Sequence, residues 1–437
     1  MKLRLITICI LINCSLVFGQ KKSEESVVDR FLRYAKFDTQ SQEDLETTPT
    51  TNHQFAFAKR LVAELKSLGL QNISLDDHCF VFATLPSNLP KDQAKEIPVI
   101  GLISHIDTSP AVSGKDVHPV IHTNYQGDDI ILPNDPKQVL SVAKNPRLKD
   151  YIGDSIITAD GTTLLGADDK AGVAEIMTAM QALVNNPSIK HGTVKIAFTP
   201  DEETGTGIGK FDVKKFGARY AYTIDGGTLG EINEESWNAD QATVTFHGKS
   251  THPGTAKGMM VNSMYAAADF LLQLPDSMKP ETTEKREGFI HPDHGTLGVE
   301  ESSIKFILRD FDKSGLDNQH AILKAIRDSS LQHFPGTAID LDIKPDYRNM
   351  KVVLDSVPFV IANAVEACKR AGVVPEIVPI RGGTDGSDLT FVGLPCPNIF
   401  TGGENFHSKL EWVPVRGMNK AVETLLNLIQ IWREKNS

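Results

Sequence analysis

Cysteine is scarce in this chain of 437 residues. It has five cysteines, none of them in a Cys-x-x-Cys spacing, and Cys9 and Cys14 fall within the first twenty residues. The other three, Cys79, Cys368 and Cys396, cannot all pair with one another. This scarcity excludes a disulfide scaffold and thiolate zinc sites, so a metal in this protein would be held by carboxylate and imidazole groups.

A surplus of basic residues is also missing, because 45 Lys and Arg stand against 56 Asp and Glu, for a net charge of −11. General binders of nucleic acid need a basic face, so nucleic acid is not expected as a partner. The content of 40% hydrophobic and 23% charged residues describes a globular protein. A chain of this length predicts two domains.

Long apolar runs are missing beyond the N-terminus. Residues 1–4 are basic, residues 5–18 are mostly apolar, and Gly19 precedes Gln20. This order predicts a signal peptide over residues 1–19 and export to the periplasm or the medium. A short membrane anchor is the alternative, but the run is shorter than the roughly 20 apolar residues that span a bilayer. No stable membrane span is therefore expected once the signal is removed.

Four apolar, β-like runs end in residues that can bind metals or transfer protons. Residues 98–104 run into His105 and Asp107, residues 193–198 into Glu202 and Glu203, residues 220–224 into Asp225, and residues 397–400 into a segment that contains His407. Runs that are apolar throughout predict strands buried on both faces, hence an α/β fold with a mostly parallel central sheet flanked by helices. Ligands of such sheets bind beyond the carboxyl ends of the strands, so we expect one site.

Asp168 and Asp169 precede a predicted helix, whose N-terminus favours ionised carboxylates. Apolar residues with the spacing of one buried helix face follow them: Val173, Ile176, Met177, Met180 and Val184. Taken alone, the pair has an ordinary interpretation as a helix cap with a solvated neighbour. The nearby strand ends favour a place in the site.

Two imidazoles and several carboxylates suit Zn²⁺, Mn²⁺ or Co²⁺, and they suffice for two metals if Asp168 bridges them. His105 and Asp107 lie two apart on a strand and point to the same side, so one can bind a metal while the other contacts its ring. Glu202 and Glu203 are adjacent in a turn, so one can bind a metal while the other acts as a general base.

The pattern changes near Gln241, where apolar and polar residues begin to alternate. Such alternation is typical of an antiparallel sheet with one solvated face. We therefore predict an inserted α+β domain at residues 238–346, between the two parts of a catalytic domain at residues 20–237 and 347–437. Residues 109–163 are long for a connection and predict a functional segment or subsidiary structure rather than empty coil. We interpret residues 291–294 as a solvated turn.

Five segments together resemble the peptidase T family: residues 101–108, 165–172, 198–203, 223–227 and 381–386. This family is the tripeptide aminopeptidase branch of the dizinc metallopeptidases, which also include carboxypeptidase G, carnosinase and succinyl-diaminopimelate desuccinylase. The resemblance runs from about Val27 to the C-terminal helix. It implies that the inserted domain is a lid of ferredoxin-like type that closes over the substrate and through which a homodimer can form.

The resemblance also implies roles for single residues. His105 and Asp225 would bind one zinc ion, Glu203 and His407 the other, and Asp168 would bridge the two. Asp107 would orient His105, Glu202 would be the general base, and the peptide bond after Asp168 would be cis. The implied substrate contacts are His252, Arg309 and Arg381.

The implied activity is the zinc-dependent release of the N-terminal residue from tripeptides, by a metal-activated water whose proton Glu202 accepts. Zinc, assisted by His252, would stabilise the oxyanion, and Co²⁺ or Mn²⁺ could replace Zn²⁺. The alternatives within the same family are a dipeptidase, a carboxypeptidase or a deacylase. A further alternative is a metal-dependent binding protein without turnover, but the presence of Glu202 argues against it. Family members are usually cytoplasmic, so the export signal is a departure and a cytoplasmic location is the alternative.

Overall fold

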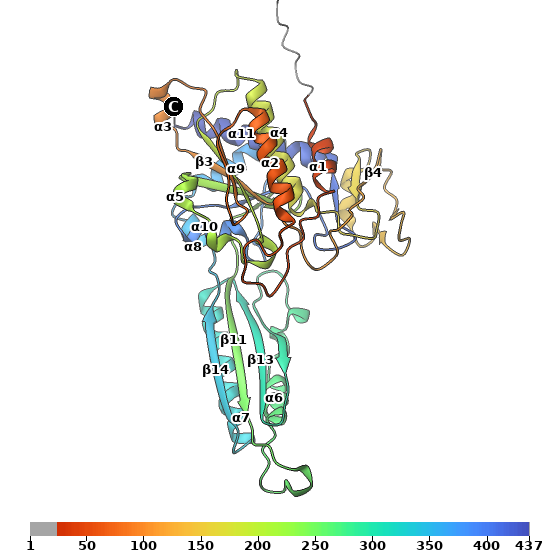
Figure 1. Cartoon of the computed structure of the whole chain (residues 1–437), viewed down its shortest axis with the longest axis vertical. Coiled ribbons are helices and arrows are strands. Elements are labelled where there is room, and N and C mark those ends of the chain that lie inside the picture. The colour runs from red at the N-terminus through yellow and green to blue at the C-terminus, as the bar shows by residue number, and fades with distance from the viewer. Residues whose placement is uncertain (1–23, 437) are drawn as a thin grey trace, which may run out of the picture.

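The computed structural model describes residues 24–436, so the predicted signal peptide at residues 1–19 lies outside the described part of the chain. Figure 1 shows a broad α/β body from which a narrower unit extends. Segments before and after the narrow unit both belong to the body. Within residues 24–436, no helix is both long and apolar enough to cross a membrane.

An eight-stranded sheet forms the centre of the body, in the order β1-β2-β8-β3-β9-β16-β10-β15. The neighbours β8, β3, β9 and β16 are parallel, while β2 is antiparallel to β8 and β10 to β16. The mostly parallel sheet is thus confirmed, and the carboxyl ends of its four central strands share one edge. The strands are β1 (Gln71–Leu75), β2 (Val81–Leu85), β3 (Ile100–His105), β8 (Val194–Thr199), β9 (Tyr220–Gly226), β10 (Glu231–Asn233), β15 (Glu376–Ile377) and β16 (Asn398–Phe400).

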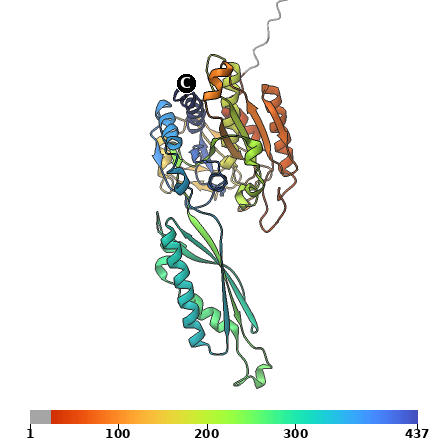
Figure 2. The ribbon, with the colours of Figure 1, turned by 90° about the vertical axis from the view of Figure 1, so that its left-hand side faces the viewer.

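Helices cover both faces of this sheet (Figure 2). Neighbouring residues of β3 show the two layers, because Leu102 packs in the core shared with α1, α2, α4, α9 and α11, whereas Ile103 packs with Phe216 of α5 and Leu389 of α10. The apolar runs are therefore buried on both sides, as predicted. The helices of the body are α1 (Val27–Tyr34), α2 (Gln54–Leu68), α3 (Lys91–Glu96), α4 (Ala167–Asn185), α5 (Val213–Phe216), α8 (Lys351–Leu354), α9 (Phe359–Arg370), α10 (Asp385–Phe391) and α11 (Val415–Glu434).

Helix α4 begins beside the end of β9, and Gly172 allows this approach. A Cβ at Gly172 would collide with the carbonyl oxygen of Ile224 in β9. The predicted apolar face of the helix is confirmed, with Val173, Ile176 and Met177 fully buried. This packing brings the first turn of α4 to the edge of the sheet where β9 ends.

Residues 109–163 form a subsidiary unit with its own small core. Its elements are β4 (Val120–His122), β5 (Ile130–Ile131), β6 (Val139–Leu140), the 3₁₀ helix η1 (Pro146–Tyr151) and β7 (Ile156–Thr158). Strand β17 (Trp412–Pro414) pairs with β7, and Trp412 packs against Tyr151 at a ring-centroid distance of 5.6 Å. The segment that follows His407 is therefore attached to this unit.

The narrow unit has the element order β-α-β-β-α-β, and its antiparallel sheet has the strand order β12-β13-β11-β14. This is a ferredoxin-like arrangement. Helices α6 and α7 cover one face of the sheet (Figure 2), around a core that contains Phe246, Phe270 and Phe306. Its elements are β11 (Asn238–His247), α6 (Ser263–Leu272), β12 (Phe289–Thr296), β13 (Glu301–Asp310), α7 (Lys313–His333) and β14 (Ala338–Pro345). We refer to this unit as the lid and propose residues 238–346 as its extent.

The interpretation of residues 291–294 as a solvated turn is wrong. They lie in β12, which pairs with β13 and shifts register between Pro292 and His294. Strand β12 is at the edge of its sheet, where a proline without an N–H group and a bulge are tolerated. The proline and the bulge interrupt the alternation that marks the other lid strands in the sequence.

The three cysteines of the described residues, Cys79, Cys368 and Cys396, are buried and free. No disulfide therefore contributes to the fold of residues 24–436. This agrees with the exclusion of a disulfide scaffold.

Candidate metal centre

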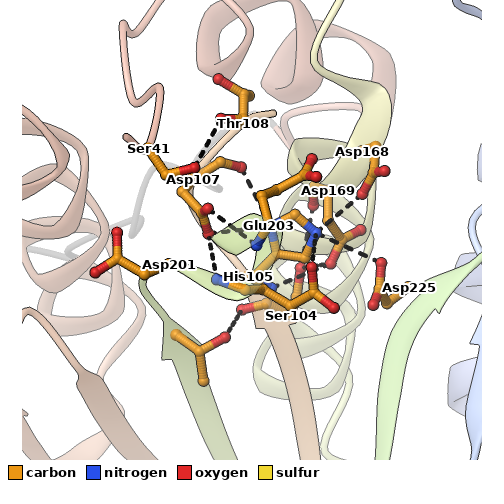
Figure 3. Close-up of polar contacts among 12 residues, drawn as sticks. Ser41, Ser104, His105, Asp107, Thr108, Asp168, Asp169, Asp201, Glu203 and Asp225 are labelled. Atoms are coloured by element: carbon orange, nitrogen blue, oxygen red, sulfur yellow. Dashed lines mark hydrogen bonds and ion pairs between the residues drawn. The ribbon is translucent and has the colours of Figure 1, made fainter. Parts of the chain in front are cut away.

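The carboxyl end of β3 supplies His105 and Asp107, both buried (Figure 3). The Nδ1 atom of His105 lies 3.3 Å from Oδ1 of Asp107. Its Nε2 atom lies 2.9 Å from Oδ1 of Asp168 and 3.5 Å from Oδ1 of Asp225. Asp107 thus contacts one ring nitrogen of His105, while the other faces the two carboxylates, an arrangement typical of metal-bound imidazoles.

Asp168 lies between the two imidazoles. Its oxygens are 2.9 Å from Nε2 of His105 and 3.1 Å from Nε2 of His407. The peptide bond between Asp168 and Asp169 is cis, which confirms that prediction. A carboxylate with one oxygen toward each imidazole has the geometry of a bridging ligand.

Glu203 and His407 meet on the other side of Asp168. Oε2 of Glu203 lies 2.8 Å from Nε2 of His407. Oε1 of Glu203 is buried and has no hydrogen-bond partner among residues 24–436. A buried carboxylate oxygen without a partner is costly, so this atom is available to a cation.

The ligand atoms form two groups that share Asp168. Those of His105, Asp168 and Asp225 lie within 4.8 Å of one another, and so do those of Asp168, Glu203 and His407. Catalytic zinc usually has three protein ligands and one open position. The donor set therefore fits two cations per chain.

The carboxylates and imidazoles of the cluster shift one another's pKa values. The hydrogen bond to Asp168, followed by that to Glu203, raises the pKa of His407 to about 10. Burial raises the pKa of Glu203 to about 7. Burial would also raise the pKa of Asp168, but hydrogen bonds from His105 and His407 outweigh it and lower that pKa. A cation that binds here displaces protons from these groups.

Glu202 lies beside the two ligand groups and belongs to neither. Its Oε2 atom is 4.0 Å from Nε2 of His105. The carboxylate of Asp107 accepts the N–H of Glu202 at 3.1 Å and the N–H of Glu203 at 3.3 Å. Asp107 therefore fixes both the ring of His105 and the turn from which the two glutamates diverge. Burial, followed by the charge of Asp225, raises the pKa of Glu202 well above its ordinary value in the absence of a cation.

Sequence reasoning gives no role to several buried polar groups that support the cluster. Asp169 accepts the N–H of His105 at 3.2 Å and the N–H of Gly172 at 3.2 Å. Asp201 accepts the N–H of Thr50 at 2.7 Å, which attaches the turn before Glu202 to the N-terminal segment. The signal for Asp169 in the sequence is its place beside Asp168 at the predicted helix N-terminus, and the signal for Asp201 is its place beside Glu202.

Lys170 and Glu411 are two more such groups. The ammonium of Lys170 is fully buried and donates to the carbonyl oxygen of Phe37 at 2.7 Å. Burial lowers its pKa to about 8, against the charges of Asp38 and Glu411. Glu411 accepts the backbone N–H groups of Leu165 and Gly166, which precede α4, and of Asp168 in its first turn. No motif marks Glu411, because its partners lie about 245 residues earlier in the chain.

Arg309 and Arg381 lie where the lid joins the body, and none of their hydrogen bonds or ion pairs within residues 24–436 reaches the ligand groups. Arg309 lies 3.5 Å from Oδ2 of Asp346, with its guanidinium 5.1 Å from the ring centroid of Tyr347. The guanidinium of Arg381 lies 4.9 Å from the ring centroid of Trp237 and donates to the carbonyl oxygen of Lys285 at 2.9 Å.

The loop after strand β11 lies at the end of the lid farthest from the body (Figure 1). Strand β11 runs from Asn238 to His247, and ten residues at about 3.3 Å each span roughly 33 Å. His252 follows that strand in an exposed loop, where its ring accepts the N–H of Gly254. The structure therefore does not bring His252 to the ligand groups of its own chain.

The sequence and the fold of this chain are similar to those of known proteins. The model of peptidase family M20/M25/M40 matches residues 159–431. Peptidase T of Caldanaerobacter subterraneus subsp. tengcongensis is 47% identical over 409 residues, which cover 94% of this chain and 99% of that relative. The structure of aminopeptidase PepT from Bacillus cereus has a TM-score of 0.72 at 23% identity and covers 94% of this chain and 98% of its own. A dinuclear metal-binding peptidase of the M20 family from Bacillus subtilis has a TM-score of 0.61 at 14% identity, with coverages of 93% and 98%.

Proposed function

Since the chain belongs to peptidase family M20/M25/M40 and to its peptidase T branch, we propose that it is a zinc-dependent aminopeptidase that releases the N-terminal residue of tripeptides. The observation that carries the proposal is the pair of three-ligand groups that share Asp168, with Glu202 beside them. Imidazoles and carboxylates without a thiolate suit Zn²⁺ and also accept Co²⁺ or Mn²⁺.

Two zinc ions bound here would supply the positive charge that acidifies a water molecule and polarises the peptide carbonyl. The chain itself supplies the proton transfer. Glu202 accepts the proton of the attacking water on its carboxylate and returns it to the leaving amine. Asp107 holds the backbone N–H of Glu202, so the base keeps its place beside the ligand groups.

Elemental analysis and a substrate panel test this function. We expect two metals per chain, and a higher kcat/KM for a free tripeptide than for a dipeptide or an N-acetylated tripeptide. A preference for the dipeptide would indicate a dipeptidase of the same family. A preference for the acetylated peptide would indicate a deacylase.

We further propose that Arg309 and Arg381 bind the C-terminal carboxylate of the tripeptide. Both guanidinium groups lie at the junction of lid and body, where closure of the lid changes their surroundings. A guanidinium can hold a carboxylate through two parallel hydrogen bonds. Arg309→Ala and Arg381→Ala are expected to reduce the preference for a free tripeptide over its C-terminal amide by about tenfold or more, since such a bond contributes about 1.5–3 kcal/mol.

Arg370→Ala is the matched control for this pair. Arg370 forms exposed ion pairs with Glu366 at 3.0 Å and Glu434 at 2.8 Å on the surface of the body. Exposed pairs contribute little, so this variant is expected to keep the parent's preference. If Arg309→Ala and Arg381→Ala also keep it, other residues measure the length of the peptide.

We also propose that the enzyme is exported. The support is the basic start, the apolar run and Gly19 before Gln20. Mass spectrometry of the protein from its native cells is expected to find a chain that begins at Gln20. A cytosolic protein that retains residues 1–19 would place the enzyme in the cytoplasm.

A homodimer through the lid is proposed for two reasons. His252 is remote from the site of its own chain, so any contact of His252 with a substrate requires a second copy. Tyr265 and Leu272, seven residues apart on α6, have exposed fractions of 65% and 87%, and clustered exposed apolar side chains mark interaction surfaces. Native mass spectrometry of the same sample is expected to show two chains, and a monomer at assay concentrations would reject the dimer.

A further inference from the structure

Glu411 is a buried carboxylate that the chemistry above does not use. It is 1% exposed. Its Oε2 atom accepts the N–H groups of Leu165 at 2.8 Å and Gly166 at 2.9 Å, and its Oε1 atom accepts the N–H of Asp168 at 3.0 Å. Three backbone donors of the turn that carries the shared ligand therefore end on one side chain.

The backbone of Glu411 belongs to the loop that carries His407. Glu404 and Trp412 close this loop with two backbone hydrogen bonds of 2.9 and 3.1 Å. Glu411 lies just inside that closure and donates its own N–H to the carbonyl oxygen of Ser408 at 3.3 Å. One residue thus joins the loop of His407 to the turn of Asp168.

We propose that Glu411 is a positioning residue that sets the spacing between Asp168 and His407, and so determines the affinity of the cation bound by Asp168, Glu203 and His407. The inference rests on the proposed dizinc function of the site. An ionised carboxylate offers only acceptors, which is what three converging N–H groups require. An amide in its place would direct an NH₂ group at one or more of these donors.

The two cations are expected to respond unequally to a change at Glu411. His105 and Asp225 are held by β3 and β9 in the central sheet, so their group depends on Glu411 only through Asp168. The other group depends on Glu411 through both Asp168 and His407. Loss of an outer partner of a metal ligand typically weakens metal binding by about 10 to 100-fold.

The test is a titration of the metal-free protein with Zn²⁺ in competition with a chromogenic chelator, which yields one Kd for each site. In Glu411→Gln, the Kd of one site is expected to rise by about 10 to 100-fold, while the other changes by only a few-fold. Peptide hydrolysis is expected to recover as the concentration of Zn²⁺ is raised. A merely structural role would instead weaken both sites together, without recovery.

Asp160→Asn is the matched control. Asp160 is a carboxylate with 2% exposure that accepts the N–H of Thr162 at 2.9 Å and the amide of Asn134 at 2.8 Å within the subsidiary unit. Its variant is expected to keep both Kd values of the parent. If Glu411→Gln does not fold, Glu411→Asp is tested in its place, since its carboxylate is retracted by one methylene. The same changes in the two Kd values and the same recovery of hydrolysis are then expected.

Two results would overturn the inference: unchanged Kd values in the Glu411 variants, or equal weakening of both sites. A parent protein that binds fewer than two zinc ions would instead show that the proposed dizinc site fails, and the role of Glu411 with it. The parent titration therefore separates failure of the proposed function from failure of this inference.

Discussion

Asp168→Ala is expected to lose both metals and, with them, peptide hydrolysis. The two ligand groups have only Asp168 in common, so the substitution leaves His105 with Asp225 and Glu203 with His407. Two protein ligands are fewer than the three that catalytic zinc usually has. Elemental analysis is expected to find close to no zinc in the variant. The rate of hydrolysis should fall by more than the roughly 100-fold that is typical when a residue that contacts a metal ligand, but not the metal, is lost.

The Asp168→Ala variant is expected to fold, which separates metal loss from unfolding. The substitution leaves the apolar face of α4 packed in the core, where Val173, Ile176 and Met177 are fully buried, so the loss of the contacts of Asp168 with His105 and His407 is expected to remain local. Circular dichroism and thermal unfolding check the fold, with Asp160→Asn as the control for a change at a buried carboxylate. Two full equivalents of zinc in Asp168→Ala would reject the shared ligand, and one equivalent would assign Asp168 to a single site.

The sequence was sufficient to predict the edge of the sheet at which the cluster forms. The apolar run at residues 98–104 predicted a strand buried on both faces. The structure agrees, because all six residues of β3 are buried. The parallel order of β8, β3, β9 and β16 then brings the residues after each strand to one edge. That rule depends only on local patterns and on the handedness of the connections, both of which the sequence carries.

The supporting groups could not be predicted in the same way. The role of Glu411 depends on the distance of its carboxylate from three N–H groups at the start of α4, which no spacing in the sequence records. Nothing in the sequence distinguishes Lys170 from a surface lysine, whereas in the structure its ammonium is buried and donates to the carbonyl oxygen of Phe37. Such contacts arise from packing between helices, strands and loops, whereas sequence patterns predict only the single elements.

The direction of the lid was also beyond the sequence. Alternation from about residue 241 onward correctly indicated strands, but it does not say which end of a strand faces the body. The structure places Arg309 opposite Ala239 at the near end of the sheet and His252 beyond its far end. The resemblance therefore implied that Arg309 and His252 both contact the substrate, whereas the structure places them at opposite ends of the lid sheet, about 33 Å apart.

Glu202→Gln is expected to keep both metals and the fold but to lose about 10² to 10⁴ in turnover. Glu202 belongs to neither ligand group, and its backbone N–H remains bound to Asp107. The amide has nearly the shape of the carboxylate but cannot accept a proton from water. Metal content and kcat/KM for a tripeptide, measured on the same preparation, check both halves of this expectation.

Glu203→Gln is the matched control, because it makes the same chemical change at the adjacent residue. Oε2 of Glu203 lies 2.8 Å from His407 within a ligand group, so this variant is expected to lose metal from the group of Asp168, Glu203 and His407.

A base must be deprotonated to act, so kcat/KM of the parent should fall as the pH drops through the pKa of Glu202 in the metal-loaded enzyme. The residual activity of Glu202→Gln should lack that acidic limb. A loss of only a few-fold with the limb intact would assign the proton transfer to another group, since the limb would then report a different carboxylate.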